Sequence, residues 1–383
     1  MRISIRYTGL KILLVANTSW YLYNFRLSHA RRLRELGYMP VFVSPRDEFT
    51  GKLASQGFEW VELGLNRRSM NPIAELGVLV RLVRIYFKHK PSLVHHFTIK
   101  CVLYGTIAAR VSGARRIVNS VTGLGHVFLD QRPVVRIVRP FVMRLYRAVL
   151  NSERVTTIFQ NGDDMDFFVK SRIVRPEKAC LIRSSGVNTE HFKPEPRRET
   201  AGRPVVLFAS RLLREKGVLE FMSAARSLGN SNIRFVIAGQ PDHGNPSSFT
   251  DAEIQLFKSE GVAEFAGHVA NMKELILDST IVVLPSYREG VPKILIEALA
   301  MERPVIATDV PGCREAVEHM KNGMLVPVRS AVALADAIVA LLKNEKMMRE
   351  FGRYGREKAI RDFSEAKVIA STFDVYGIGR GGE

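Results

Sequence analysis

Hydrophobic residues fall into short runs, and each run is followed by polar residues and then by a helical pattern. Lys11–Asn17 (KILLVAN) is such a run and is typical of a buried parallel strand. Arg26–Leu36 is predicted to form the following helix, which Gly37 ends, and Pro40–Ser44 is the next strand. Further strands are expected at Leu93–His96, Arg116–Val121 and Thr156–Gln160. This alternation is typical of an α/β fold with a parallel sheet.

A break in the pattern occurs at Lys193–Pro204 (KPEPRRETAGRP), where prolines, charges and a glycine replace the periodic hydrophobicity. We interpret residues 193–204 as a linker between two doubly wound, Rossmann-like domains, 1–192 and 205–364. A C-terminal helix within 365–383 is expected to return to the first domain and to end in a frayed tail. The predicted strands of the second domain are Val205–Ala209, Arg234–Ala238, Ile281–Pro285, Pro304–Ala307 and Gly323–Val326, and its predicted helices include Val218–Ser227 and Lys293–Met301. Ligands of such sheets bind outside the carboxyl ends of the strands, so a cleft between the domains is the expected site.

Composition narrows the class of protein. The chain has 383 residues, of which 46% are hydrophobic and 25% charged, which indicates globular domains. Cys101, Cys180 and Cys313 are far apart, so neither a disulfide framework nor a zinc site is indicated. The N-terminus lacks a signal-peptide pattern, and no apolar run reaches the roughly 18 residues of a spanning helix. The sequence therefore predicts a cytoplasmic protein.

The net charge of +18 is concentrated in the first half of the chain. Residues 1–190 contain 30 Lys and Arg against 13 Asp and Glu, whereas residues 191–383 contain 26 against 25. A basic half of this kind indicates an anionic partner, which could be nucleic acid, an acidic membrane surface or a phosphorylated substrate.

One basic stretch, Arg132–Leu150, has the pattern of an amphipathic helix that could lie on an anionic membrane. Pro140 is expected to prevent one straight helix, and a core helix with a solvated basic face remains an alternative. Val78–Lys90 is a second basic and apolar stretch. At about 100° per residue, one arc holds Arg132, Arg136, Arg139, Arg144 and Arg147, and Val138, Phe141, Leu145 and Val149 lie opposite.

The strongest candidate site is Ser286–Glu297 (SYREGVPKILIE), where a strand ends, the chain turns and a helix begins. The N-terminus of a helix presents unpaired N–H groups that suit a diphosphate. Glu289 before the helix and Glu297 two turns into it could accept hydrogen bonds from two sets of sugar hydroxyls. Alternatively, Glu289 caps the helix and Glu297 lies on its solvated face.

A second candidate, Ala209–Gly217 (ASRLLREKG), follows the first strand of the second domain. Arg211 and Lys216 are placed in a βα loop, where their charges could neutralise a leaving diphosphate without a metal ion. A solvated, charge-rich loop is the alternative. Because the two motifs follow strands of one domain, we expect them to act together.

Two other motifs could be mistaken for metal sites. His95 and His96 end a predicted strand, and adjacent strand residues point to opposite faces, so they are not expected to share an ion. Asp164-Met165-Asp166 is formally a DxD motif, but it opens a helical stretch after Asn161, where acidic residues are common.

These motifs together resemble the retaining glycosyltransferase family 4, which adopts the GT-B fold. The resemblance rests on Glu289 and Glu297 with seven residues between them, Arg211, Lys216, the turn Gly186-Val187-Asn188 and the segment Pro304–Val317 (PVIATDVPGCREAV). In the first half, Asn17–Arg26 (NTSWYLYNFR), Asn66–Pro72 (NRRSMNP) and Val121–Gln131 (VTGLGHVFLDQ) resemble the subgroup that extends polyprenyl-diphosphate-linked sugars, notably its N-acetylgalactosaminyltransferases.

The resemblance implies roles for individual residues. Glu289 would hold hydroxyls of the transferred sugar, Glu297 the ribose hydroxyls, and Arg211 and Lys216 the diphosphate. Further donor contacts are expected at Gly239, Val269, Gly290, Val291, Pro292 and Lys293, and acceptor contacts at Asn24, Arg26, Arg67, Arg68, Thr122, Gly123 and Gly125. Many family members have a histidine at the position of Thr122, and His126 is displaced along the loop, so that histidine's donor contact is in doubt here.

The implied activity is retaining transfer of a sugar, an N-acetylhexosamine by preference, from a UDP-sugar to a polyprenyl-diphosphate-linked saccharide in bacterial glycan assembly. The enzyme would need no cofactor or metal ion and would act at the inner face of the cytoplasmic membrane. A sugar-nucleotide epimerase on the same architecture, a nucleic-acid-binding protein and an inactive lectin-like binder are the alternatives. The sequence leaves open the nucleotide base, the sugar, the acceptor, the linkage, the oligomeric state and the pathway.

Overall fold

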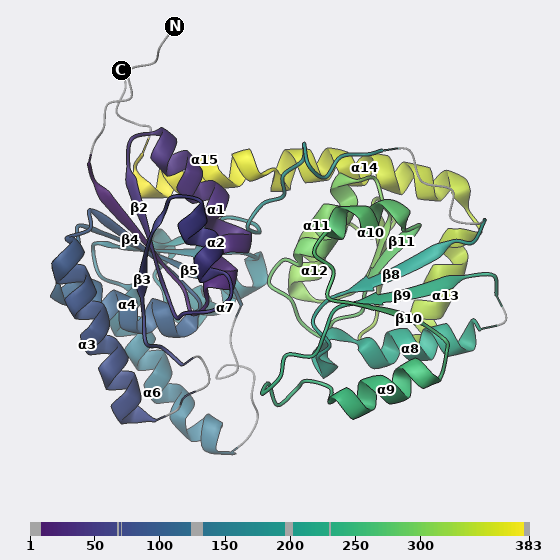
Figure 1. Cartoon of the computed structure of the whole chain (residues 1–383), viewed down its shortest axis with the longest axis horizontal. Coiled ribbons are helices and arrows are strands. Elements are labelled where there is room, and N and C mark those ends of the chain that lie inside the picture. Colours follow the sequence, from purple (N-terminus) through teal and green to yellow (C-terminus); the bar gives the residue numbers. More distant parts are fainter. Residues whose placement is uncertain are drawn as a thin grey trace, which may run out of the picture. The chain divides into compact units, whose positions relative to one another are not determined.

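The computed structural model describes residues 9–66, 69, 71–123, 133–195, 202–229 and 231–378, without the side chains of 133–135, 137 and 138. The chain divides into two compact units. The first comprises Met1–Ser185 and Ile369–Glu383, and the second comprises Gly186–Val368 (Figure 1). The division therefore comes before the expected linker, of which residues 196–201 lie outside the described ranges, as do residues 379–383 of the tail.

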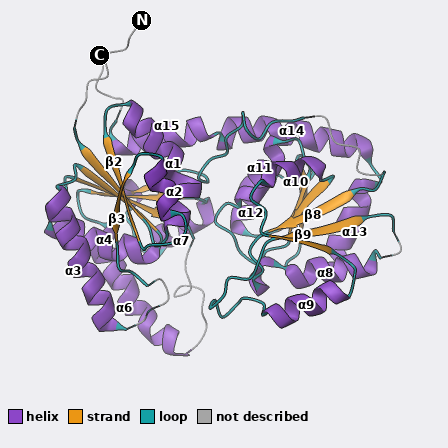
Figure 2. Ribbon diagram, viewed as in Figure 1, coloured by secondary structure: helices purple, strands orange, loops and turns teal. Residues whose placement is uncertain are grey.

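Unit 1 is built on a seven-stranded parallel sheet with the strand order β3-β2-β1-β4-β5-β6-β7. Helices cover both faces of the sheet, as Figure 2 shows. The strands are β1 Lys11–Val15, β2 Met39–Ser44, β3 Glu59–Glu62, β4 Leu93–Phe97, β5 Arg116–Val121, β6 Val155–Phe159 and β7 Ala179–Leu181. The helices are α1 Ser19–Glu35, α2 Thr50–Ser55, α3 Pro72–His89, α4 Ile99–Val111, α6 Pro133–Leu150, α7 Gly162–Lys170 and, from Ile369 on, α15 Glu365–Tyr376, with a 3-10 turn at Pro176–Lys178.

Helix α1 begins seven residues earlier than the hydrophobic pattern predicted. Thr18 has an extended backbone, and its side chain accepts a hydrogen bond from the Tyr21 amide, so it caps the helix. The helix ends before Gly37, which has a φ of 84°. The early start brings Arg26 into the middle of a helix that packs on the sheet.

The expectation that Pro140 would interrupt the basic helix is wrong. Helix α6 runs without a break from Pro133 to Leu150, with Pro140 inside it. A proline in a helix removes one backbone hydrogen bond, and packing offsets this loss, because Tyr146, Val149 and Leu150 are buried in the core of unit 1. Of the apolar side predicted from the sequence, Val149 is buried, whereas Phe141 and Leu145 are exposed.

Unit 2 has a six-stranded parallel sheet with the strand order β10-β9-β8-β11-β12-β13. The strands are β8 Val205–Ala209, β9 Arg234–Ala238, β10 Glu264–Gly267, β11 Ile281–Leu284, β12 Val305–Thr308 and β13 Gly323–Val326. The helices are α8 Val218–Ser227, α9 Asp251–Ser259, α10 Met272–Asp278, α11 Lys293–Ala300, α12 Pro311–Ala316, α13 Ala331–Leu342 and α14 Glu345–Phe363, with a 3-10 turn, η2, at Arg214–Lys216.

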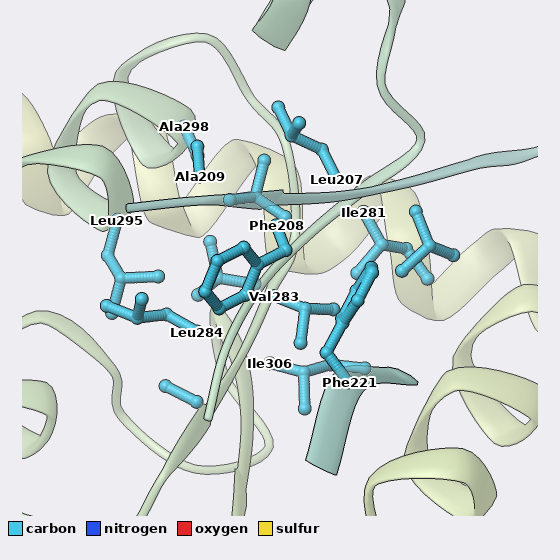
Figure 3. Packing of buried hydrophobic residues seen from close by; sticks show 14 of the residues in the cluster. Leu207, Phe208, Ala209, Phe221, Ile281, Val283, Leu284, Leu295, Ala298 and Ile306 are labelled. Carbon is cyan, nitrogen blue, oxygen red and sulfur yellow. The ribbon is translucent and has the colours of Figure 1, made fainter. Parts of the chain in front are cut away.

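The core of unit 2 forms where helices pack on the central strands (Figure 3). Phe208 of β8 lies 5.4 Å from Phe221 of α8 between ring centroids. Leu295 and Ala298 of α11 are fully buried in the same cluster. Burial of this apolar area anchors α8 and α11, the two helices that follow the candidate loops.

Each sheet has one switch point, which is the place in the strand order where the chain changes the direction in which it adds strands. In unit 1 the chain reverses its direction of travel across the sheet between β1 and β4, and in unit 2 between β8 and β11. Ligands of open α/β sheets bind at the carboxyl ends of the strands that flank such a point. The expected α/β class with two doubly wound domains is therefore confirmed.

Candidate active site

The loop after β8 approaches the end of β11 closely, and a glycine makes this possible. Gly217 has a φ of 78°, and a Cβ atom there would lie 2.1 Å from the carbonyl oxygen of Pro285. Tyr287 N also donates to Glu215 O at 2.8 Å. These contacts hold the turn η2, and with it Lys216, against the loop that carries Glu289.

Lys216 and Glu289 form an ion pair at the switch point of unit 2. Lys216 Nζ donates to Glu289 Oε1 at 2.6 Å, and Ser286 Oγ donates to the same oxygen at 2.6 Å. The two charged side chains are 15% and 12% exposed. The pair is sheltered but accessible to a ligand, and the two residues come from loops 73 positions apart in the sequence.

The turn that carries Glu289 is packed tightly from the side of α12. A Cβ atom on Gly312 would lie 1.9 Å from the carbonyl oxygen of Gly290, so only a glycine permits the observed contact. The Thr308 hydroxyl donates to the carbonyl oxygen of Ser286. This packing fixes the backbone of the turn and thereby the direction of the Glu289 side chain.

Both alternatives to a functional role for the two glutamates are wrong as stated. Pro292 occupies the N-cap position of α11, and no side chain caps the helix there, so Glu289 is not its cap. Glu297 is buried and not on a solvated face, and Lys293 Nζ lies 3.6 Å from its Oε1. Burial raises the pKa of the Glu297 carboxyl, and the Lys293 charge partly offsets this.

Arg211 lies at the same edge of the sheet but pairs with a different acid. Arg211 Nη1 donates to Asp242 Oδ2 at 2.8 Å, and Asp242 follows the neighbouring strand β9. Because β8 lies between β9 and β11, Arg211 is directed to one neighbour and Lys216 to the other. Sequence reasoning missed Asp242, and it gave Ser286 no role of its own within the candidate site Ser286–Glu297, since short polar residues in loops give no signal without their neighbours.

The remaining expected donor contacts lie around this edge. Gly239 follows β9, and a Cβ atom there would lie 1.8 Å from the carbonyl oxygen of Ser210, so it allows the loops after β8 and β9 to touch. Val269 and Val291 are half-buried and pack against the core of unit 2. Gly290, Pro292 and Lys293 belong to the turn and the first residue of α11.

The expected acceptor residues in unit 1 fall at the carboxyl ends of β1 and β5 or outside the described residues. Asn24 on α1 is half-buried, with its side chain donating to Trp20 O at 2.9 Å, and Arg26 is buried. Thr122 and Gly123 directly follow β5 and are half-buried. Arg67, Arg68, Gly125 and His126 lie outside the described residues.

His95 and His96 point to opposite faces of β4, as predicted. His95 bonds Tyr376 Oη at 2.5 Å, and His96 Nδ1 bonds Asn119 Oδ1 at 2.8 Å. Within the described part of the chain, no three His, Cys, Asp or Glu side chains are grouped so that they could hold a metal ion.

The DxD residues lie at the start of α7, as the sequence indicated. Asn161 caps this helix by accepting from the amide of Asp164 at 2.8 Å. Asp166 pairs with Lys170 at 2.7 Å on the surface. The two acidic residues therefore have local partners in a helix start.

Comparisons with known families identify both halves of the chain. Residues 11–161 match the family described as "Glycosyl transferase 4-like", and residues 189–358 match "Glycosyl transferases group 1". Together these regions include the strands of both sheets apart from β7.

Two curated relatives are similar over most of their length. The chain is 27% identical over 92% of its length, and over 94% of the relative, to the N,N'-diacetylbacillosaminyl-diphospho-undecaprenol alpha-1,3-N-acetylgalactosaminyltransferase of Campylobacter jejuni. It is 23% identical, over 81% of each chain, to the UDP-Gal:alpha-D-GlcNAc-diphosphoundecaprenol alpha-1,3-galactosyltransferase of Escherichia coli.

Solved structures share the fold. A glycosyltransferase from Rickettsia africae aligns with a TM-score of 0.78 at 20% identity, covering 98% of this chain and all of that one. HepE from Anabaena, solved in complex with UDP and glucose, aligns with a TM-score of 0.79 at 18% identity, covering 96% of this chain and all of that one. The GT-B fold and the resemblance to family 4 are therefore confirmed.

Proposed function

This chain belongs to the glycosyltransferases: its first region matches the glycosyl transferase 4-like family and its second region matches glycosyl transferases group 1. From that premise we propose that it transfers a sugar from a nucleotide-sugar to a saccharide linked to a polyprenyl diphosphate. The observation that carries this proposal is the ion pair of Lys216 and Glu289 at the switch point of unit 2. A cation and a carboxylate in contact suit a donor that offers a diphosphate beside sugar hydroxyls.

In the proposed reaction the departing nucleotide takes the bonding electrons, so negative charge grows on its diphosphate in the transition state. Lys216 and Arg211 would stabilise this charge, and the Glu289 carboxylate would accept hydrogen bonds from hydroxyls of the transferred sugar. Glu289 Oε1 already accepts from Lys216 and Ser286. This arrangement favours a positioning carboxylate over a covalent nucleophile. We propose that the acceptor hydroxyl oxygen forms the new glycosidic bond on the face from which the nucleotide departs, which retains the configuration, and that its proton passes to the departing phosphate.

The finer specificity is proposed from the relatives. The Campylobacter relative is named for N-acetylgalactosamine transfer to a diphospho-undecaprenol-linked sugar, and the Anabaena structure contains UDP. We therefore propose a UDP-linked N-acetylhexosamine as donor and bacterial surface-glycan or glycoprotein-glycan assembly as the setting. We propose that no metal ion is needed, because the charges of Lys216 and Arg211 could neutralise the diphosphate. These identities agree with the diphosphate-binding role that we propose for Lys216 and Arg211.

An exposed apolar stripe on α3 supports work at a membrane surface. Ile73 and Leu76 are 82% and 60% exposed, and Val80 and Phe87 are exposed farther along the helix. Their spacing of three, four and seven residues places them on one side of α3. Large exposed apolar side chains in a row are unusual in a monomer and indicate an interaction surface.

Exposed basic residues lie close to this stripe, which favours binding to an anionic bilayer. Arg81, Arg84, Lys88 and Lys90 are exposed on or directly after α3. On α6, the exposed Phe141 and Leu145 have Arg144 and Arg147 beside them, and α4 packs against both α3 and α6. Among the described helices, none is long and apolar enough to cross a bilayer. We therefore propose peripheral binding at the inner face of the cytoplasmic membrane.

Sugar transfer is tested by incubating the purified protein with a panel of nucleotide-sugars and a short-chain polyprenyl-diphosphate-linked saccharide. We expect mass spectrometry to detect one added N-acetylhexosamine with UDP-linked donors, with little change when EDTA is present. Conversion of the donor without any acceptor would instead identify an epimerase. A salt-sensitive oligonucleotide shift without transfer would identify a nucleic-acid-binding protein.

Membrane binding is tested with vesicles that contain anionic lipid. Replacing Leu76 and Phe87 by glutamate should weaken partitioning by at least about 10-fold, because each loses roughly 2 kcal/mol of apolar burial. Co-sedimentation measures the bound fraction. Val332→Glu on α13 of unit 2 is a control, since Val332 is an exposed apolar residue (74%) that lies outside the stripe. Equal binding by all variants would exclude this surface.

A further inference from the structure

Unit 1 contains a buried cation, Arg26, without an acidic partner in the part of the chain that the structure describes. Arg26 on α1 is 4% exposed, and its Nη2 donates to Tyr21 Oη at 3.0 Å. Its Nε is buried and has no acceptor among the described residues, and no ion pair joins Arg26 to a carboxylate there. The guanidinium carbon lies 4.4 Å from the centroid of the Phe97 ring. The aromatic ring stabilises the charge in part, but it accepts no hydrogen bond from the free N–H groups.

A second side chain without partners lies on the same face of the helix. His29 follows Arg26 by three residues, is 1% exposed, and has no hydrogen bond at either ring nitrogen within the described residues. Burial, and next the Arg26 charge, hold the pKa of His29 well below its usual range, so the ring is neutral. His95, whose pKa both effects also lower, has partners in Tyr376 and Ser120.

Arg26 lies at the switch point of unit 1. Helix α1 follows β1, and Phe97, which the guanidinium contacts, is the last residue of β4. This is the topological position that Lys216 and Glu289 occupy between β8 and β11 of unit 2. Lys216 has a carboxylate partner in unit 2, whereas Arg26 has none among the described residues of unit 1.

An unpaired buried charge is unfavourable, and an apolar side chain of similar volume would fit a core better. Buried polar groups without partners in a folded protein call for a specific explanation, of which a bound ion is one. The position at a ligand-binding edge, together with the basic character of residues 1–190, identifies an anionic ligand as that explanation here.

We propose that Arg26 binds a phosphate group of the lipid-linked acceptor, with His29 available as a further hydrogen-bonding group. The inference rests on the proposed function and adds the chemical feature of the acceptor that unit 1 recognises. A planar guanidinium with free N–H donors matches phosphate oxygens in a bidentate geometry. Acceptors without a diphosphate should then be poor substrates.

The test compares two acceptors that carry the same saccharide, one on a polyprenyl diphosphate and one as an alkyl glycoside. Arg26→Met should lower kcat/KM for the diphosphate acceptor at least 100-fold and leave the slow reaction of the alkyl glycoside unchanged. Arg26→Lys keeps the positive charge but lacks the paired N–H donors of the guanidinium, so it should recover part of the lost activity. Arg31→Met on the same helix is the control, since Arg31 is exposed and bonds Gln56. An equal loss with both acceptors would overturn the proposal.

A binding measurement separates this site from the donor site and does not require turnover. Pyrophosphate should raise the Tm of the wild-type protein and of the double variant Lys216→Ala, Arg211→Ala, in which the donor-site cations are absent. The shift should disappear when Arg26→Met is added to the double variant. If Arg26→Met fails to fold, Arg26→Lys with a reduced Tm shift takes its place. A shift that disappears only in the double variant would assign the anion to the donor site and refute the inference. If no acceptor reacts, the proposed function fails, while the Tm shift still decides the role of Arg26.

Discussion

Replacing Lys216 by alanine is expected to lower kcat/KM for sugar transfer by roughly 10²–10³-fold, the usual effect of losing one positioned group that stabilises transition-state charge. Lys216 Nζ is held at 2.6 Å from Glu289 at the switch point, where it can meet a leaving diphosphate. Initial rates over a range of donor concentrations measure the change. The loss should appear mainly in kcat, because the charge on the diphosphate grows as the glycosidic bond breaks.

The same substitution removes the cationic partner of a sheltered carboxylate, so a moderate loss of stability accompanies it. The free energy of unfolding should fall by roughly 1–3 kcal/mol, the cost of leaving a buried polar group unsatisfied. Thermal unfolding measures this and shows whether the fold is intact. Arg214→Ala is the matched control, because Arg214 lies in the same 3-10 turn but is exposed and pairs with Glu253. Near-normal turnover of Lys216→Ala would remove the residue from the mechanism.

Replacing Glu289 by glutamine is expected to reduce transfer by roughly 10²-fold or more, since the charge-assisted hydrogen bonds to Lys216 and Ser286 weaken and the sugar hydroxyls lose their anionic acceptor. The substitution preserves the shape of the side chain. The affinity for UDP, measured by titration calorimetry, should change much less, because Glu289 is expected to contact the sugar and not the nucleotide.

Two further glutamate variants show whether the effect is specific to Glu289. Glu297→Gln should instead weaken donor binding, since Glu297 is expected to hold the ribose, and its loss should raise KM. Glu264→Gln should leave transfer unchanged, because Glu264 begins β10 at the amino end of the sheet and pairs with Arg234. If Glu289→Gln and Glu264→Gln behaved alike, the carboxylate at the switch point would have no part in the reaction.

The central strands could be predicted because both of their faces are buried. A strand inside a parallel sheet must be apolar along its whole length, so β5, β8 and β9 were located to the residue from short hydrophobic runs. The edge strand β13 was also located, because its sequence GMLV is apolar. The three strands that the pattern missed, β3, β7 and β10, all lie at sheet edges. Edge strands are half exposed, and EWVE or EFAG carries no continuous apolar run.

Parts of the site were predictable for a similar reason. A loop that follows a parallel strand lies at the ligand edge of its sheet, so the order of strand, loop and helix placed Arg211, Lys216 and Glu289 at one edge. Which of them touch depends on strand order. The sheet places β8 between β9 and β11, so Lys216 meets Glu289 while Arg211 meets Asp242. Nothing in the spacing of these residues distinguishes the two pairings.

The sequence by itself determined the fold class, the positions of most buried strands and the chemical character of the donor site, because each depends on local patterns of burial and on loops next to strands. The tertiary structure alone decided the pairing of Lys216 with Glu289, the burial of Glu297 and the lack of an acidic partner for Arg26 among the described residues. These properties depend on which distant segments the sheet brings together, and the free energy of a charge is set by those neighbours and by its access to water.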